Sequence, residues 1–179
     1  MKSVKIQNLT FDLYMDATEI TSINRSVAQM IDEHYADKAD VIAIIILKGG
    51  YVFGADLLRL VTKDIPVYFI QLSSYIDTKS TGEVAISQVN LPELTNKHVL
   101  IIEDIIETGL SMETLLRQPE FSGVASIELC TLLLKPTELK TKLDVKFIGK
   151  SIPSDFVVGY GLDYNEYGRH LPDIYHLRK

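Results

Sequence analysis

The chain has 179 residues, of which 46% are hydrophobic and 23% charged, so it is long enough for a packed core, and we expect a single domain over residues 1–179. Its net charge of −6 argues against a surface built for nucleic acid, and a single cysteine excludes an internal disulfide framework. The N-terminus lacks the apolar core of a signal peptide and no apolar run is long enough to span a membrane, so we expect a cytoplasmic protein.

The chain begins with a short extended segment and continues with apolar residues at helical spacing. This spacing predicts a helix over 17–37, capped by Thr18, and a second helix over 51–61. A third helix is expected to begin at about Gly109. Runs of apolar residues predict strands at 41–46, 67–72, 84–90, 98–104, 126–135 and 156–163, followed by an irregular, aromatic tail.

Buried strands that alternate with helices predict an α/β fold, with a mainly parallel, twisted sheet covered by helices on both faces. Ligands bind to such sheets beyond the carboxyl ends of the strands. Three loops should therefore meet at one edge, namely 47–50, 73–83 and 103–111, and Asp163 could join them from the end of the last strand.

The loop at 103–111 combines two kinds of chemistry. Free amides at a helix start attract an anion, and Gly109 and the neighbouring hydroxyls suit a phosphate. The acids before them, Glu103 and Asp104, suit sugar hydroxyls, and a bound Mg²⁺ would relieve their repulsion. Together these features predict a sugar phosphate site. The plainer alternative is that Asp104 and Glu107 only cap the helix while the glycine makes a tight turn.

Four segments carry a resemblance to a known family. The segment from Val99 reads VLIIEDIIETGLSM and resembles the phosphoribosyl-diphosphate motif of the type I phosphoribosyltransferases. Three others resemble, in the same order, the signatures of the hypoxanthine-guanine branch of that family: LKGGYVFGADLL, SSYIDTKSTGEV and FVVGYGLDYNEYGRHLP. The matches span residues 47–172. The resemblance implies the fold of that family, in which a small hood formed by the terminal segments covers the sheet edge.

The resemblance also implies roles for single residues. Glu103 and Asp104 should hold the ribose, and Glu107 falls where the family usually has an aspartate that takes a proton from the purine. Lys135 should bind the purine oxygen at position 6, Phe156 should stack on the base, and Val157 should offer its backbone to the purine edge. The 5′-phosphate should be held by Thr108, Gly109, Leu110 and Ser111.

The remaining implied roles concern the diphosphate, the metal and a lid. The loop Leu47, Lys48, Gly49 and Gly50 should bind the diphosphate, with a cis peptide before the lysine, and Arg169 should reach the same group. The family's mobile lid matches the segment that contains Ser74 and Tyr75, although a plain hairpin loop is the alternative. Mg²⁺ is the implied cofactor, with Glu103, Asp104 and Asp163 as its candidate ligands.

The activity implied is the conversion of hypoxanthine or guanine, with phosphoribosyl diphosphate, into IMP or GMP and diphosphate. The expected partners are these small molecules, without nucleic acid or membrane, in a homodimer or homotetramer. One alternative is a transferase that prefers xanthine, since that base also carries the 6-oxo group. Another is a regulator that binds the same ligands without turnover. The glutamate at position 107 is the one feature that favours such a loss of catalysis.

Overall fold

The computed structural model describes residues 2–74, 84–87 and 91–179. The larger of its two sheets has the strand order β5-β4-β3-β6-β7-β8. All neighbours in it are parallel except β5, which runs antiparallel to β4. Its strands are β3 (Val41–Leu47), β4 (Val67–Ser74), β5 (Val84–Ser87), β6 (His98–Ile106), β7 (Ser126–Leu134) and β8 (Phe147–Ser151).

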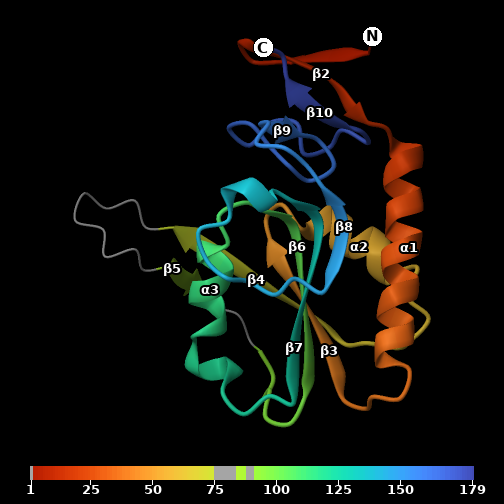
Figure 1. Ribbon diagram of the computed structural model, residues 1–179, viewed down its shortest axis with the longest axis vertical. Helices are drawn as coiled ribbons and strands as arrows, with labels where there is room; N and C mark the ends of the chain where they lie inside the picture. Colours follow the sequence, from red (N-terminus) through yellow and green to blue (C-terminus); the bar gives the residue numbers. More distant parts are fainter. Residues whose placement is uncertain (1, 75–83, 88–90) are drawn as a thin grey trace.

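Helices cover both faces of this sheet, as the sequence predicts. Figure 1 shows α1 (Ala17–Tyr35) and α2 (Tyr51–Leu58) on one side and α3 (Leu110–Leu116) on the other. Two hydrophobic cores follow from this layering, one beneath α1 and α2 and the other beneath α3. Two short 3₁₀ helices, η1 (Pro119–Phe121) and η2 (Pro136–Glu138), complete the connections. Within the described ranges, no helix is both long and apolar enough to cross a membrane.

Helix α1 packs on the sheet because its apolar residues recur on one face. Ile20, Val27 and Ile31 on that face are almost fully buried. The cap expected at Thr18 is wrong, because the helix begins at Ala17 and the side chain of Asp16 accepts a hydrogen bond from the amide of Glu19 at 2.9 Å. Asp16 and Glu19 therefore have the spacing of a helix N-cap.

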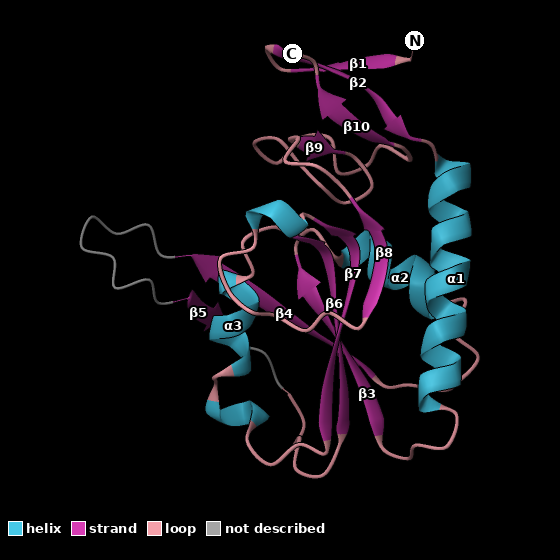
Figure 2. Ribbon diagram, in the orientation of Figure 1, coloured by secondary structure: helices cyan, strands magenta, loops and turns pink. Residues whose placement is uncertain are grey.

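The second sheet forms the hood expected from the terminal segments (Figure 2). It joins β1 (Ser3–Ile6), β2 (Leu9–Met15), β10 (Ile174–Leu177) and β9 (Val157–Val158) in that order, with all pairs antiparallel. The tail expected to be irregular thus contributes β10. Asp173 ties this sheet to α1, since its carboxylate accepts hydrogen bonds from the amide of Ala17 and from the hydroxyl of Tyr175 and pairs with Lys2.

Several expected boundaries differ from those in the structure. Helices α1 and α2 end earlier than expected, and the strand expected over 156–163 is only Val157–Val158. Of the strand expected over 84–90, the described part is β5. Strand β8 was not expected from the sequence. Strand β6 continues two residues beyond Asp104, because its parallel pairing with β7 extends to Ile106 opposite Leu134. The two acids therefore lie inside the strand rather than at its end.

Candidate active site

The carboxyl ends of β3, β6 and β7 meet beneath the hood, and two cavities open there. One has a volume of about 250 Å³ and lies between the end of β6 and the start of α3. The other has a volume of about 310 Å³ and lies between β6, the loop after β3 and the hood segment from Phe156 to Arg169. Ile105 and Glu107 line both cavities, so the two spaces share a border.

The first cavity contains the small-residue turn that the sequence singled out. Thr108, Gly109 and Ser111 line it together with Glu103. Gly109 precedes the first residue of α3 and has a φ angle of +77°, a conformation that glycine adopts without strain. A Cβ at this position would also lie 2.7 Å from the side chain of Thr141. The turn is thus closely packed from behind while its other side faces the cavity.

The paired acids open onto different cavities. Side chains alternate along a strand, so Glu103 faces the first cavity whereas Asp104 faces the second. Burial is the largest cause that raises the pKa of each carboxyl group, and the neighbouring Asp104 raises the pKa of Glu103 further. Hydrogen bonds with Glu103 and with the amide of Ile105 oppose the rise at Asp104. Two adjacent acids are thus held where ionising both is costly without a cation or a hydrogen-bond donor.

Glu107 and Lys135 form an ion pair at the border of the cavities. The register of the sheet brings them together. Ile106 lies opposite Leu134, and Glu107 and Lys135 are the next residues along the two strands' paths. Lys135 is only 4% exposed, while half of the Glu107 side chain is accessible. The buried ammonium group is therefore compensated by a carboxylate that still reaches the cavities.

The hood contributes the far wall of the second cavity. Phe156, Val157, Asp163 and Arg169, to which the resemblance assigns substrate or metal contacts, line it. Phe156 is 43% exposed, so part of its ring remains available for a planar ligand. Its other neighbours are aromatic, with ring centroids 6.2 Å away at Phe11 and 6.1 Å away at Tyr164.

Two glycines allow the hood, the loop after β3 and strand β6 to touch. A Cβ at Gly161 would lie 2.3 Å from the carbonyl oxygen of Gly49, and a Cβ at Gly49 would lie 1.9 Å from Oδ2 of Asp104. Gly161 also has a φ angle of +99°. Any side chain at either position would separate these three layers. The peptide bond between Leu47 and Lys48 is cis, as the resemblance implies.

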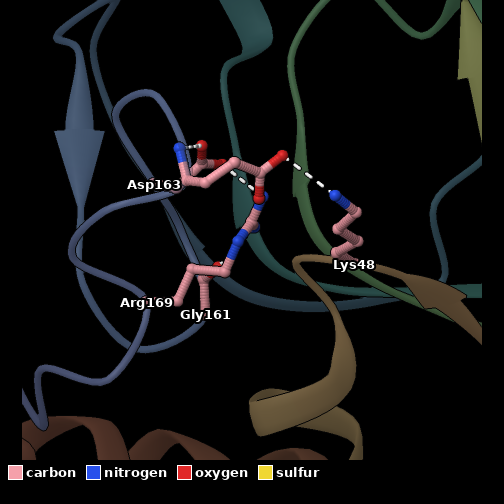
Figure 3. A network of polar contacts seen from close by, with 5 residues as sticks. Lys48, Gly161, Asp163 and Arg169 are labelled. Atoms are coloured by element: carbon pink, nitrogen blue, oxygen red, sulfur yellow. Dashed lines mark hydrogen bonds and ion pairs between the residues drawn. The ribbon is translucent and has the colours of Figure 1, made fainter.

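A polar network joins the hood to the loop after β3 (Figure 3). Lys48 donates to Oε1 of Glu166 at 2.9 Å, and Nη2 of Arg169 donates to Oε2 of Glu166 at 3.0 Å. Arg169 also donates to the carbonyl of Gly161 and pairs with Asp163, both at 2.8 Å. Sequence reasoning missed Glu166. It lies inside a signature segment, but nothing in its local pattern marks it as a contact of Lys48.

Most of the expected site residues meet at the two cavities. The lining includes Gly49, Glu103, Asp104, Glu107, Thr108, Gly109, Ser111, Phe156, Val157, Asp163 and Arg169. Lys135 and Lys48 do not line either cavity, but Lys135 pairs with the lining residue Glu107, and Lys48 is linked to the lining residue Arg169 through Glu166. Leu47 ends β3, Gly50 lies in the loop after it and Leu110 begins α3, and none of the three is among the residues that line either cavity. The side chain of Ser74, as well as Tyr75 and the rest of the expected lid up to Glu83, lies outside what the structure describes.

Metal ligands are less concentrated than the sequence suggests. In the described ranges, no three His, Cys, Asp or Glu side chains are grouped so that they could hold an ion. Asp104 and Asp163 line the same cavity, whereas Glu103 faces the other one and Asp163 already pairs with Arg169.

Comparisons with known proteins agree with this architecture. Residues 14–165 match the model of the phosphoribosyl transferase domain. The hypoxanthine-guanine phosphoribosyltransferase of Staphylococcus epidermidis is 40% identical over 164 residues, which cover 91% of each chain. A hypoxanthine phosphoribosyltransferase structure from Staphylococcus aureus is 37% identical, with a TM-score of 0.86 over 93% of this chain and 91% of the other. A Trypanosoma cruzi hypoxanthine phosphoribosyl transferase is 28% identical, with a TM-score of 0.87 over 98% and 95% of the chains.

Proposed function

Because the chain belongs to the phosphoribosyl transferase domain family, and within it to the hypoxanthine-guanine phosphoribosyltransferases, we propose how its own residues share the work of that reaction. The reaction is one of purine salvage. Ribose 5-phosphate moves from phosphoribosyl diphosphate to a purine nitrogen of hypoxanthine or guanine, and diphosphate leaves. The product is IMP or GMP.

The observation that carries the assignment is the position of Glu107. Its side chain borders both cavities and pairs with Lys135. On one side lies the turn with Thr108 and Ser111, which suits the 5′-phosphate through its hydroxyls and free amides. On the other side lies Phe156, which suits the base. The ribose then spans the border, where the carboxylates of β6 can accept hydrogen bonds from its hydroxyls.

Glu107 is the group that accepts the proton of the incoming purine nitrogen. Its carboxylate is partly exposed and lies in the space that the base must enter. Lys135 donates to the 6-oxo group, and an ammonium donor there discriminates against adenine, whose amino group is itself a donor. The ion pair between the two residues fixes both side chains before the base arrives.

The diphosphate group is held by the loop from Leu47 to Gly50 and by Arg169. The support is their convergence, since Gly161 of the hood contacts Gly49 of the loop directly and Arg169 donates to the carbonyl of Gly161. Because glycine has no side chain, a leaving anion can approach the backbone of this loop closely.

The donor set fits Mg²⁺, which prefers carboxylate oxygens and is usually bound by one or two of them together with substrate phosphates. Asp104 and Asp163 line one cavity, and burial raises the pKa of both Glu103 and Asp104, which a cation would reverse. Asp104 and Asp163 are the proposed ligands, whereas Glu103, the third candidate from the sequence, faces the other cavity and is left out of this set. When bound, the ion would neutralise charge on the diphosphate and make it a better leaving group.

We also propose the domain organisation, the oligomeric state and the cellular location. A single domain over residues 1–179 is supported by the family match over 14–165. The proposed assembly is a homodimer or homotetramer located in the cytoplasm. The oligomer, but not the location, is supported by Val67 and Phe69, which project from the same face of β4 and are 39% and 45% exposed. The Trypanosoma cruzi study addresses the role of the C-terminal region in the oligomeric state of that enzyme.

The direct test is an assay of the purified protein with phosphoribosyl diphosphate, Mg²⁺ and each of hypoxanthine, guanine and xanthine in competition. We expect nucleotide formation with hypoxanthine or guanine. A protein that forms no nucleotide with any 6-oxo purine would refute the proposal, and nucleic-acid binding without turnover would favour a regulator.

A further inference from the structure

The carboxylate of Glu166 lies between two cations that come from distant parts of the chain. Each carboxylate oxygen accepts a hydrogen bond from one cation: Oε1 from Lys48 at 2.9 Å and Oε2 from Arg169 at 3.0 Å. Figure 3 shows Lys48 reaching from the loop after β3 and Arg169 from the hood toward the same place. The structure thus contains an anion between the two cationic side chains that we assign to the diphosphate.

The positive φ angle of Glu166 suggests that its side chain has a functional role. Asn165 and Glu166 form a two-residue turn between Tyr164 and Tyr167, and their φ angles are +51° and +68°. Such turns usually have glycine at the second position, because it adopts positive φ without strain. Non-glycine residues held at positive φ cost free energy, and they cluster at active sites and ligand-binding segments.

Arg169 has more partners and is less exposed than Lys48. Arg169 is 19% exposed and is fixed by Gly161 and Asp163 as well as by Glu166. The side chains of Lys48 and Glu166 are 54% and 63% exposed, so their pairing is readily exchanged for another partner. Arg169 lines the second cavity, so its guanidinium lies beside the space that an incoming anion would enter.

A carboxylate and a phosphate group present oxygens to Lys and Arg in similar ways. We propose that Glu166 acts as an internal substitute for the diphosphate anion. Its carboxylate holds Lys48 beside Arg169 while the site is empty, and it moves aside when a diphosphate group takes its place. This inference rests on the proposed function, because it uses the assignment of Lys48 and Arg169 to diphosphate. It makes Glu166 a positioning residue whose charge competes with the ligand.

The competition has a definite sign. Glu166 has an exposed carboxylate that pairs with both Lys48 and Arg169, so it carries the negative charge that a diphosphate group would replace. Replacing it with a neutral side chain removes a negative charge from the anion site and frees two cations. Diphosphate should therefore bind more tightly after the substitution, whereas loss of a merely structural contact would leave binding unchanged or weaken it.

The test is calorimetric titration with inorganic diphosphate, without metal and at low ionic strength. We expect Glu166→Gln to bind diphosphate about two- to ten-fold more tightly than the unmodified protein, as expected for the loss of exposed ion pairs. Glu166→Gly should show the same gain and a higher melting temperature, because glycine relieves the positive φ. The gain should be smaller in a Lys48→Gln background, where one of the two cations is already absent.

Glu19→Gln is the matched control, because Glu19 is a partly exposed glutamate that pairs with Lys150, and neither residue lines either cavity. It should leave diphosphate affinity unchanged. If the unmodified protein binds diphosphate and forms nucleotide but Glu166→Gln gains no affinity over this control, the inference is wrong and the proposed function stands. If the unmodified protein neither binds diphosphate nor forms nucleotide, both are wrong.

Discussion

Replacing Gly49 with alanine tests how tightly the site is assembled. The added Cβ would lie 1.9 Å from Oδ2 and 2.6 Å from Cγ of Asp104. Carbon and oxygen atoms that are not bonded approach to about 3.3 Å at closest. The carboxylate, or the loop that carries Gly49, must therefore move by about 1.4 Å, the difference between these two values.

A shift of that size should mainly lower kcat/KM. A misplacement of about 1 Å can lower a rate about 10²-fold, so we expect kcat/KM to fall by about 10²-fold, or about 2.7 kcal/mol in the barrier. Stability should fall by about 1–3 kcal/mol, as for other overpacked positions. The clash involves the end of a side chain rather than backbone, so the protein should still fold.

The measurements are steady-state kinetics with hypoxanthine and phosphoribosyl diphosphate, together with unfolding in urea. Gly123→Ala is the control, because Gly123 has a φ angle of +80° and a Cβ there would approach nothing closer than Thr95 at 3.8 Å. Its backbone strain should lower stability by about 1–2 kcal/mol without changing kcat/KM. Gly49→Ala with kcat/KM within about three-fold of the unmodified enzyme would contradict the contact between Gly49 and Asp104 as a catalytic constraint.

Three other substitutions test charged groups. Glu107→Gln should lower kcat by about 10²- to 10⁴-fold, and an unchanged kcat would exclude Glu107 as the base. Because burial raises the pKa of both Glu103 and Asp104, the ligand-free protein should lose stability as pH rises from about 4 through these raised values. Glu103→Gln should therefore stabilise it in urea unfolding at pH 8 but not at pH 4, and equal effects would refute this. The hydrogen bond from Lys2 is the largest cause that lowers the pKa of Asp173, so its contribution should be present at pH 6 and fade as pH falls below about 4. Asp173→Asn should destabilise the protein at pH 6 and less at pH 3, and a constant difference would contradict the ion pair.

The central sheet could be predicted from sequence because its strands are continuous apolar runs. Strands such as Val41–Leu47 are buried on both faces, and that composition needs no knowledge of a partner. β8 and the hood strands were harder to predict because they are short and mixed in polarity. β10, for instance, pairs with β2, more than 150 residues away, and pairing over such distances leaves no local signal.

The site divides in the same way. Sequence could predict which loops meet, because carboxyl ends of parallel strands share one edge and the signature segments name their residues. Alternation along the predicted strand already places Glu103 and Asp104 on opposite sides, but the sequence could not predict the two cavities, because each is lined by residues from other segments as well. The contact of Gly161 with Gly49 depends on where the hood lies, and no pattern within either segment encodes that position.

The two lysines assigned to the substrates differ in burial, and this difference indicates which side of the site is fixed before the ligands bind. Lys135 is buried, and removing the partner of a buried charge is costly, so its pair with Glu107 should persist while the base binds. Lys48 is exposed, and its pair with Glu166 is weak enough to be exchanged for a diphosphate oxygen. The base side of the site is therefore fixed before binding, whereas the diphosphate side adjusts on binding. Diphosphate binding and release are then the steps that charge substitutions in the hood should alter, while substitutions at the buried pair should alter the transfer itself.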